Sequence, residues 1–126
     1  MLQFTHGVEI GAHLAYVGHY KRTNDSRVGS ILEDELEHQL IIKSILKHHG
    51  RKTIFMIDLL FYMVGKMVGY MCRFSPIFML NKIAMLLELF AVVSYKQLAK
   101  EFPLYVNTFL EMEETEQEHA DYFSRN

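Results

Sequence analysis

Apolar residues recur along most of the chain at the three- and four-residue spacing that places them on one face of a helix. No stretch alternates apolar and polar residues between turn-forming positions, so no β-strand is expected. Polar, glycine-containing or proline-containing breaks divide the pattern into segments. The pattern predicts helices over about residues 5–22, 25–49, 53–72, 75–100 and 103–123. The expected caps of the first four are Thr5, Asp25 or Ser26, Thr53 and Ser75.

The segment 53–72 is apolar around most of its circumference, and its charged residues Asp58, Lys66 and Arg73 fall on one side. Such a helix is expected to be buried in the protein, to form a dimer contact or to dip into a membrane interface. No stretch of about 18 residues is free of charge, so no plain transmembrane span is expected. The N-terminus lacks a basic segment followed by an apolar run, which argues against a secretory signal.

The 126 residues suit a single all-α domain over residues 1–126, and half of them are hydrophobic, enough to bury a core. The formal net charge of −2 lacks the basic footprint of a nucleic-acid-binding protein, so no nucleic-acid partner is expected. The single cysteine, Cys72, excludes a disulfide scaffold and a cysteine-rich zinc site. We expect it to be buried or to lie in an interface, and it fits a reducing, cytoplasmic compartment.

Two Glu-x-x-His pairs interrupt apolar stripes of predicted helices. Glu35 and His38 lie on the apolar face of the second segment, and Glu116 and His119 lie on that of the fifth. The three-residue spacing stacks each pair on one side of its helix. An unpaired buried carboxylate is costly, so each pair is expected to have partners.

A single glutamate precedes each pair by a nearly equal interval, which gives the chain an internal repeat. Glu9 lies among small residues of the first segment, upstream of Glu35. Glu88 stands alone in a long apolar run of the fourth segment, upstream of Glu116. Each half therefore consists of two predicted helices, one with a Glu and the other with a Glu-x-x-His.

Four carboxylates and two imidazoles in this order form the ligand set of ferritin-like di-iron bundles. The set neutralises two divalent ions and favours iron, or alternatively manganese, over zinc. The sequence thus predicts a ferritin-like four-helix bundle with an extra apolar helix between two helical hairpins. The expected metal ligands are Glu9, Glu35, His38, Glu88, Glu116 and His119. The alternatives are a polar network in a bundle core and, for Glu9, an interaction with the helix dipole.

Three further residues are candidates for the surroundings of the site. Glu113 lies one turn before Glu116 and could assist or replace it. His13 and Tyr16 follow Glu9 by one and two turns and could face the same cavity, although a lone histidine such as His13 is more often a hydrogen-bonded core residue. The remaining histidines lie near predicted helix ends and are expected to be exposed: His6, His19, His48 and His49.

These features resemble the demethoxyubiquinone hydroxylases of ubiquinone biosynthesis. The stretches Glu9–Ala12 and Tyr16–His19 are similar to that family's Gly-Glu-Tyr-Gly-Ala-x-x-Ile-Tyr-x-Gly-Gln pattern, with Ile10 and His19 at positions where the family has Tyr and Gln. The run Phe61–Gly69 is similar in kind to its glycine-containing, membrane-associated helix. Ser94-Tyr95 stands where the family has His-Tyr.

The resemblance implies that the six residues bind two iron ions. It also implies a monooxygenase that hydroxylates a quinone or similar lipid-soluble aromatic, using dioxygen and an electron donor. The protein is then expected to be cytoplasmic or peripheral on the inner face of the membrane, with a homodimer as one arrangement. The alternatives are a ferritin-like ferroxidase or peroxide-scavenging protein, and a metal-free helical interaction module.

Overall fold

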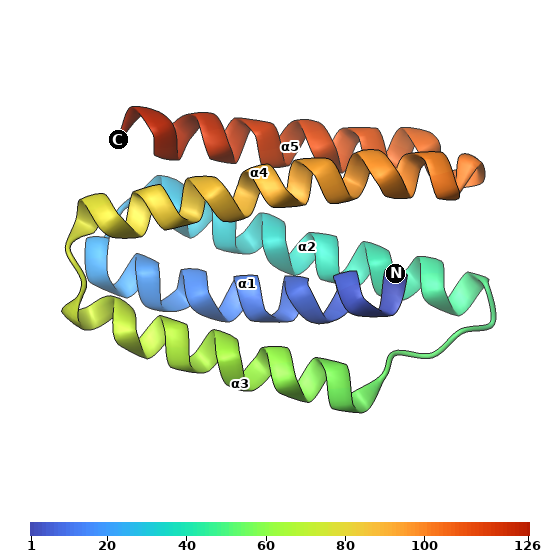
Figure 1. Cartoon of the computed structure of the whole chain (residues 1–126), viewed down its shortest axis with the longest axis horizontal. Helices are drawn as coiled ribbons and strands as arrows, with labels where there is room; N and C mark the ends of the chain where they lie inside the picture. Colours follow the sequence, from blue (N-terminus) through green and yellow to red (C-terminus); the bar gives the residue numbers. More distant parts are fainter. The chain divides into compact units, whose positions relative to one another are not determined.

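The computed structural model of the chain describes residues 1–126 and is almost entirely helical (Figure 1). Five α-helices and two short 3-10 helices are present and no strand, as the hydrophobic pattern predicts. They are α1 (Leu2–Thr23), α2 (Ser26–His48), α3 (Phe55–Met71), η1 (Cys72–Phe74), α4 (Ile77–Glu101), η2 (Pro103–Tyr105) and α5 (Val106–Arg125).

The helix ends depart from the sequence prediction mainly in their caps. The Asp25 carboxylate accepts a hydrogen bond from the Arg27 backbone N–H at 2.9 Å, as a capping residue does. The helix α1 begins three residues earlier than predicted, so Thr5 lies inside it and its hydroxyl donates to the Met1 carbonyl. Thr53 and Ser75 do not cap their helices either, because α3 and α4 begin after Ile54 and Pro76. The cap preferences of Thr5, Thr53 and Ser75 therefore do not set where these helices begin.

The chain separates into two compact units, Met1–Ser75 and Pro76–Asn126. In the first unit α1 contacts both α2 and α3, whereas α2 and α3 share at most a marginal contact (Figure 1). Apolar side chains of α1 and α2 contribute to the buried core. The most deeply buried of these are Leu2, Val28, Ile31, Ile42 and Leu46.

The contact between α1 and α3 is made largely by glycines. A Cβ atom at Gly65 would lie 2.5 Å from the Gly11 carbonyl oxygen, and one at Gly18 would overlap the Gly69 backbone. Absence of side chains at these positions lets the two helix backbones touch, as in small-residue helix interfaces. Gly65 and Gly69 are the buried residues of α3, so the rest of this apolar helix is partly or fully exposed.

The second unit is the pair α4 and α5, packed side by side and joined by η2 (Figure 1). Its core includes the stacked rings of Tyr95 and Phe109, whose centroids are 6.3 Å apart, together with Leu98 and Phe123. Much of the apolar surface of α4 remains exposed, for example Phe78 and Val93.

Two segments, Phe55–Phe74 and Ile77–Glu101, are long and apolar enough to cross a membrane by length and composition alone. Both segments contain charged residues, so the expectation of no plain, uncharged transmembrane span is not contradicted. The expectation that residues 53–72 could form a core helix is wrong, since this helix buries little more than its glycines.

Candidate metal centre

The first unit gathers one cluster of metal-binding side chains between α1 and α2. It consists of Glu9 from α1 and of Glu35 and His38, which lie on successive turns of α2. All three are at most 4% exposed, and each offers a ligand atom within 4.8 Å of the other two. The buried face of α2 places them together, because Val28, Ile31 and Ile42 share that face and turn it inward.

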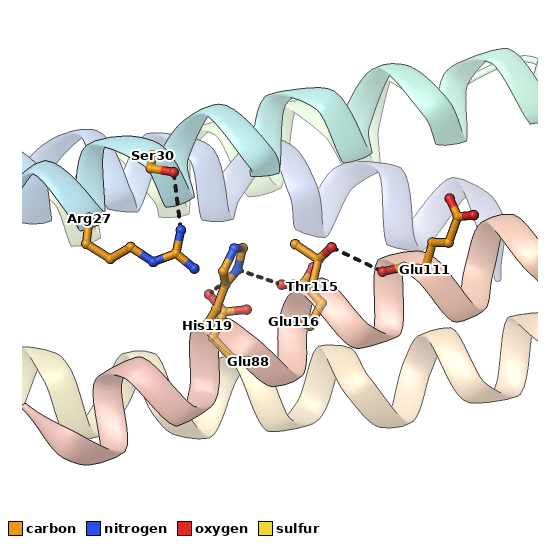
Figure 2. Close-up of polar contacts among 7 residues, drawn as sticks. All are labelled: Arg27, Ser30, Glu88, Glu111, Thr115, Glu116 and His119. Atoms are coloured by element: carbon orange, nitrogen blue, oxygen red, sulfur yellow. Dashed lines mark hydrogen bonds and ion pairs between the residues drawn. The ribbon is translucent and has the colours of Figure 1, made fainter.

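The second unit gathers a cluster of the same composition between α4 and α5 (Figure 2). Glu88 comes from α4, and Glu116 and His119 come from successive turns of α5. The His119 Nδ1 atom lies 3.1 Å from Glu116 Oε2 and 3.6 Å from Glu88 Oε1. Both α5 residues have no solvent exposure, so the imidazole and the two carboxylates share a dry environment.

The donor chemistry of each cluster fits a hard divalent cation. Two carboxylates held within 4.8 Å of each other in the protein interior repel one another and lose hydration, which favours either protonation or a bound cation. Two ionised carboxylates match the charge of one divalent ion, and the imidazole adds a neutral nitrogen ligand. Each cluster could therefore hold a metal ion.

The six residues that the sequence selects as ligands thus lie in two clusters of three, one within each unit. Glu88, the charge that is hardest to place in water from the sequence, is indeed buried and faces α5. Glu9 is inside α1 and 2% exposed, so it does not act at the helix start as the dipole alternative requires.

The three surrounding candidates have partners of their own. The His13 Nδ1–H donates to the Leu32 carbonyl oxygen at 2.9 Å, which ties α1 to α2 and fits the reading of a hydrogen-bonded core histidine. Glu113 is paired with Lys96 at 3.5 Å between α5 and α4. Tyr16 is buried, and its ring is stacked on the ring of His19 at 5.9 Å.

Sequence reasoning missed a second tyrosine that repeats the position of Tyr16. Tyr95 lies two turns after Glu88, as Tyr16 lies two turns after Glu9, and both rings are buried. The shared Glu-x-x-x-x-x-x-Tyr spacing was the available signal. The internal repeat therefore extends beyond the six acidic and imidazole side chains.

Two histidine expectations are wrong. His6 and His19 are both buried. His6 lies in the first turns of α1, which begins at Leu2 and packs against α3, whereas His19 lies near the other end of α1 with its ring stacked on that of Tyr16. His6 Nδ1 lies 3.0 Å from Asp58 Oδ1, which makes the part-buried Asp58 its acidic partner on the apolar helix α3. His48 and His49 are exposed at the end of α2, as expected. Asp58 is the single acidic residue of the apolar segment 53–72, and this was the available signal that it would have a partner such as His6.

Comparison of the chain with family models, curated proteins and solved structures finds no match. The molecule is an all-helical protein of five α-helices with buried carboxylate and histidine clusters that could bind metal. The resemblance to demethoxyubiquinone hydroxylases stands on the residues of the sequence alone.

Proposed function

We propose that the chain is a di-iron carboxylate protein in which the two clusters serve a single dinuclear centre. The observation that carries this proposal is the repetition of one buried Glu, Glu and His arrangement on both helix pairs. That is the ligand set of ferritin-like di-iron proteins. The proposed ligands are Glu9, Glu35 and His38 from the first unit, with Glu88, Glu116 and His119 from the second.

The residues of the chain would hold and shield the metal ions. The carboxylates supply the charge that retains two divalent cations, and carboxylate oxygens can bridge between ions. Ile31 lies one turn before Glu35 and Val92 one turn after Glu88, and both are buried, so apolar side chains exclude bulk water next to the ligands. Iron bound in this way supplies the redox chemistry that activates dioxygen.

The reaction that we propose is hydroxylation of a quinone or a related lipid-soluble aromatic. One atom of dioxygen is inserted into a ring C–H bond to give a hydroxyl group, and the other leaves as water after an external donor supplies two electrons and the solvent supplies two protons. The support comes from the family resemblance, from the apolar neighbours of the clusters and from the exposed apolar surface of α3. The last of these would admit a substrate that is dissolved in lipid.

The proposal is tested first by iron content. Protein from iron-replete cells should hold about two iron ions per chain, with the magnetic coupling of a dinuclear centre in Mössbauer spectra. Glu35→Ala and His119→Ala should lower the iron content sharply. Glu37→Ala and Glu118→Ala are matched controls, because these residues are exposed on the same two helices. Full occupancy in both ligand variants, or two uncoupled ions, would contradict a dinuclear centre.

Product analysis then tests the reaction. Cells that lack their own quinone hydroxylase should recover the hydroxylated quinone when they express this chain, and lose it with Glu9→Ala or Glu116→Ala. An unchanged quinone profile, together with rapid oxidation of ferrous iron by the purified protein, would instead favour the ferroxidase alternative. If the protein binds no metal at all, the remaining alternative is a metal-free helical interaction module.

A further inference from the structure

His6 is a buried histidine that the proposed metal centre does not use. Its side chain is 5% exposed, and its Nδ1 atom lies 3.0 Å from Oδ1 of Asp58 on α3. The other ring nitrogen, Nε2, is buried and has no hydrogen-bond partner among the atoms of the protein. A buried polar atom of this kind is costly and calls for a bound partner. His6 Nε2 therefore marks a binding position inside the first unit.

The pair with Asp58 fixes which nitrogen of the imidazole carries the proton. Asp58 lies in the first turn of α3, where the helix dipole interacts favourably with a carboxylate, and 19% of its side chain is exposed to water. An ionised carboxylate can only accept hydrogen bonds, so the neutral His6 ring donates its Nδ1–H to Asp58. The Nε2 atom then carries a lone pair and no proton. The group that binds at Nε2 must therefore be a hydrogen-bond donor.

Helix geometry places the Glu9 carboxylate beside His6. Glu9 follows His6 by three residues in α1, so the two buried side chains are neighbours on the helix surface. Side chains of an α-helix lean toward its N-terminus, and Glu9 therefore leans over the turn that holds His6. The nitrogens of an imidazole open on different edges of the ring, so Nε2 opens away from Asp58. The second unit shows that this spacing suffices, because Glu116 Oε2 and His119 Nδ1 approach to 3.1 Å.

A small donor has to lie between His6 and Glu9. An ionised Glu9, as a metal ligand requires, can only accept hydrogen bonds, and the same holds for His6 Nε2 in this tautomer. Two acceptors form no direct hydrogen bond with each other. No side chain of the protein donates to Nε2. A water molecule has two protons and can donate one to each acceptor, as buried waters do between polar groups.

We propose that a water molecule bound between His6 Nε2 and the Glu9 carboxylate links the Asp58–His6 pair to the metal-binding cluster of the first unit. Asp58 orients the imidazole, the imidazole orients the water, and the water holds the Glu9 carboxylate in the orientation that binds an ion. His6 and Asp58 are thus positioning residues. The metal-binding part of this inference rests on the proposed function, whereas the water link itself requires no metal ion.

The internal repeat makes this link a property of the first unit. Met85 lies three residues before Glu88, as His6 lies three residues before Glu9. A thioether is a weak acceptor and has no acidic partner to orient it. The two clusters therefore differ in the support of their first glutamate, and loss of the link should weaken one of the two ions.

Two substitutions of His6 separate the water link from the contact with Asp58. The amide of His6→Asn reaches about the place of Nδ1, so it can still donate to Asp58 but leaves nothing at Nε2. The amide of His6→Gln reaches about the place of Nε2, where its oxygen can accept from the water, but it loses Asp58. His48→Asn, at an exposed position, and Met85→Leu, at the equivalent position of the repeat, are the matched controls.

The measurement is manganese binding to the full metal-free chain by titration calorimetry, with circular dichroism to check folding. His6→Asn should weaken one of two ions about 10- to 100-fold, as loss of a hydrogen-bonding partner of a ligand does. His6→Gln should keep most of the affinity, and both controls should bind as the wild type does. The reverse order, with full affinity in His6→Asn and loss in His6→Gln, would overturn the proposal, because His6 would then only hold α3 on α1.

Nitrogen-15 NMR of the imidazoles tests the water link without metal and without changing His6. The wild-type chain should show His6 with its proton on Nδ1 and with Nε2 accepting a hydrogen bond. Glu9→Gln should shift the Nε2 signal, whereas Glu37→Gln, at an exposed position of α2, should not. A proton on Nε2, or an Nε2 signal that ignores Glu9→Gln, would overturn the link. The expected NMR signals in a chain that binds no manganese would support the link and contradict the proposed function alone.

Discussion

Glu88 is a carboxylic acid that is 3% exposed on a helix with predominantly apolar neighbours. If Glu88 and Glu116 were both ionised, or one of them were ionised without a bound cation, the lost hydration would lower the free energy of unfolding by several kcal/mol. A bound metal ion would make the electrostatic energy of the cluster favourable, because each of the two carboxylates would attract the cation instead of only repelling the other carboxylate. The residue is therefore expected to trade stability of the metal-free protein for affinity.

Replacing Glu88 by Gln tests this trade. In the metal-free protein Glu88→Gln should be neutral or stabilising, since the amide has the same shape and no charge to desolvate. The gain in melting temperature on adding manganese or ferrous iron should shrink, because a weaker site contributes less binding free energy to the folded state. Strong destabilisation of the metal-free protein would assign Glu88 to a structural hydrogen-bond network instead.

Cys72 gives a prediction that depends on pH. It is buried in η1, and desolvation raises the pKa of its thiol above the ordinary value, so the folded protein holds the proton more tightly than the unfolded chain. The contribution to stability is present below the ordinary thiol pKa and is lost as the pH rises toward the raised one. Alkylation by iodoacetamide at pH 8 should be much slower in buffer than in urea. Equal rates would show that the thiol is accessible in the folded state.

At the scale of elements, α3 is fixed to α1 by one part-buried polar pair, His6 with Asp58, and by glycine contacts. Asp58→Ala would leave the buried imidazole of His6 without its carboxylate, and should lower the free energy of unfolding by about 1–3 kcal/mol in urea titrations. His6→Phe combined with Asp58→Leu removes both partners and should recover much of the loss. Asp121→Ala, at an exposed position of α5, is the matched control and should change stability by less than about 0.5 kcal/mol.

The glycine contacts give a second test at this scale. Gly65→Ala would add a Cβ atom 2.5 Å from the backbone oxygen of Gly11, and neither helix backbone can yield locally. The variant should be destabilised although alanine improves intrinsic helix propensity by about 1 kcal/mol. Gly29→Ala in α2 is the control, because its new Cβ would meet the movable Tyr20 ring at 3.0 Å. A thermal unfolding temperature that rises for both variants would show that α1 and α3 are not in backbone contact.

The same elements show how far sequence reasoning reaches. The number of helices and their approximate spans follow from hydrophobic spacing, and the buried Glu and His positions follow from polar residues on apolar stripes. The exposure of α3 does not follow, because a helix that is apolar on most sides looks the same whether it faces protein or lipid. The burial of His6 does not follow either, since it depends on a contact with Asp58 that is remote in the sequence.

At the scale of the whole molecule, the internal repeat gives each unit the same buried set of two carboxylates and one imidazole. This set could be found from the sequence because the three-residue spacing within each Glu-x-x-His pair and the similar interval from the preceding Glu can both be read without knowing how the helices pack. Tyr95 completes the repeat of Tyr16 and was visible in the same spacing.

The repeat makes a prediction about cooperation between the units. If both clusters serve one dinuclear centre, Glu35→Ala and Glu116→Ala should each abolish most of the metal-dependent rise in melting temperature. Two independent sites would instead lose about half of that rise with either variant, and the double variant would be additive. Thermal unfolding of the four proteins with and without manganese distinguishes these outcomes.

Glu9 and the glycines of α1 lie on the same helix, and this has a mechanical consequence. Interfaces made of side chains absorb small displacements by changing rotamers, but Gly11 against Gly65 and Gly18 against Gly69 have no rotamers to change. The joint between α1 and α3 is therefore stiff, and the two helices translate and tilt together. A displacement of α3 would therefore be passed directly to α1, the helix that carries the buried Glu9 carboxylate.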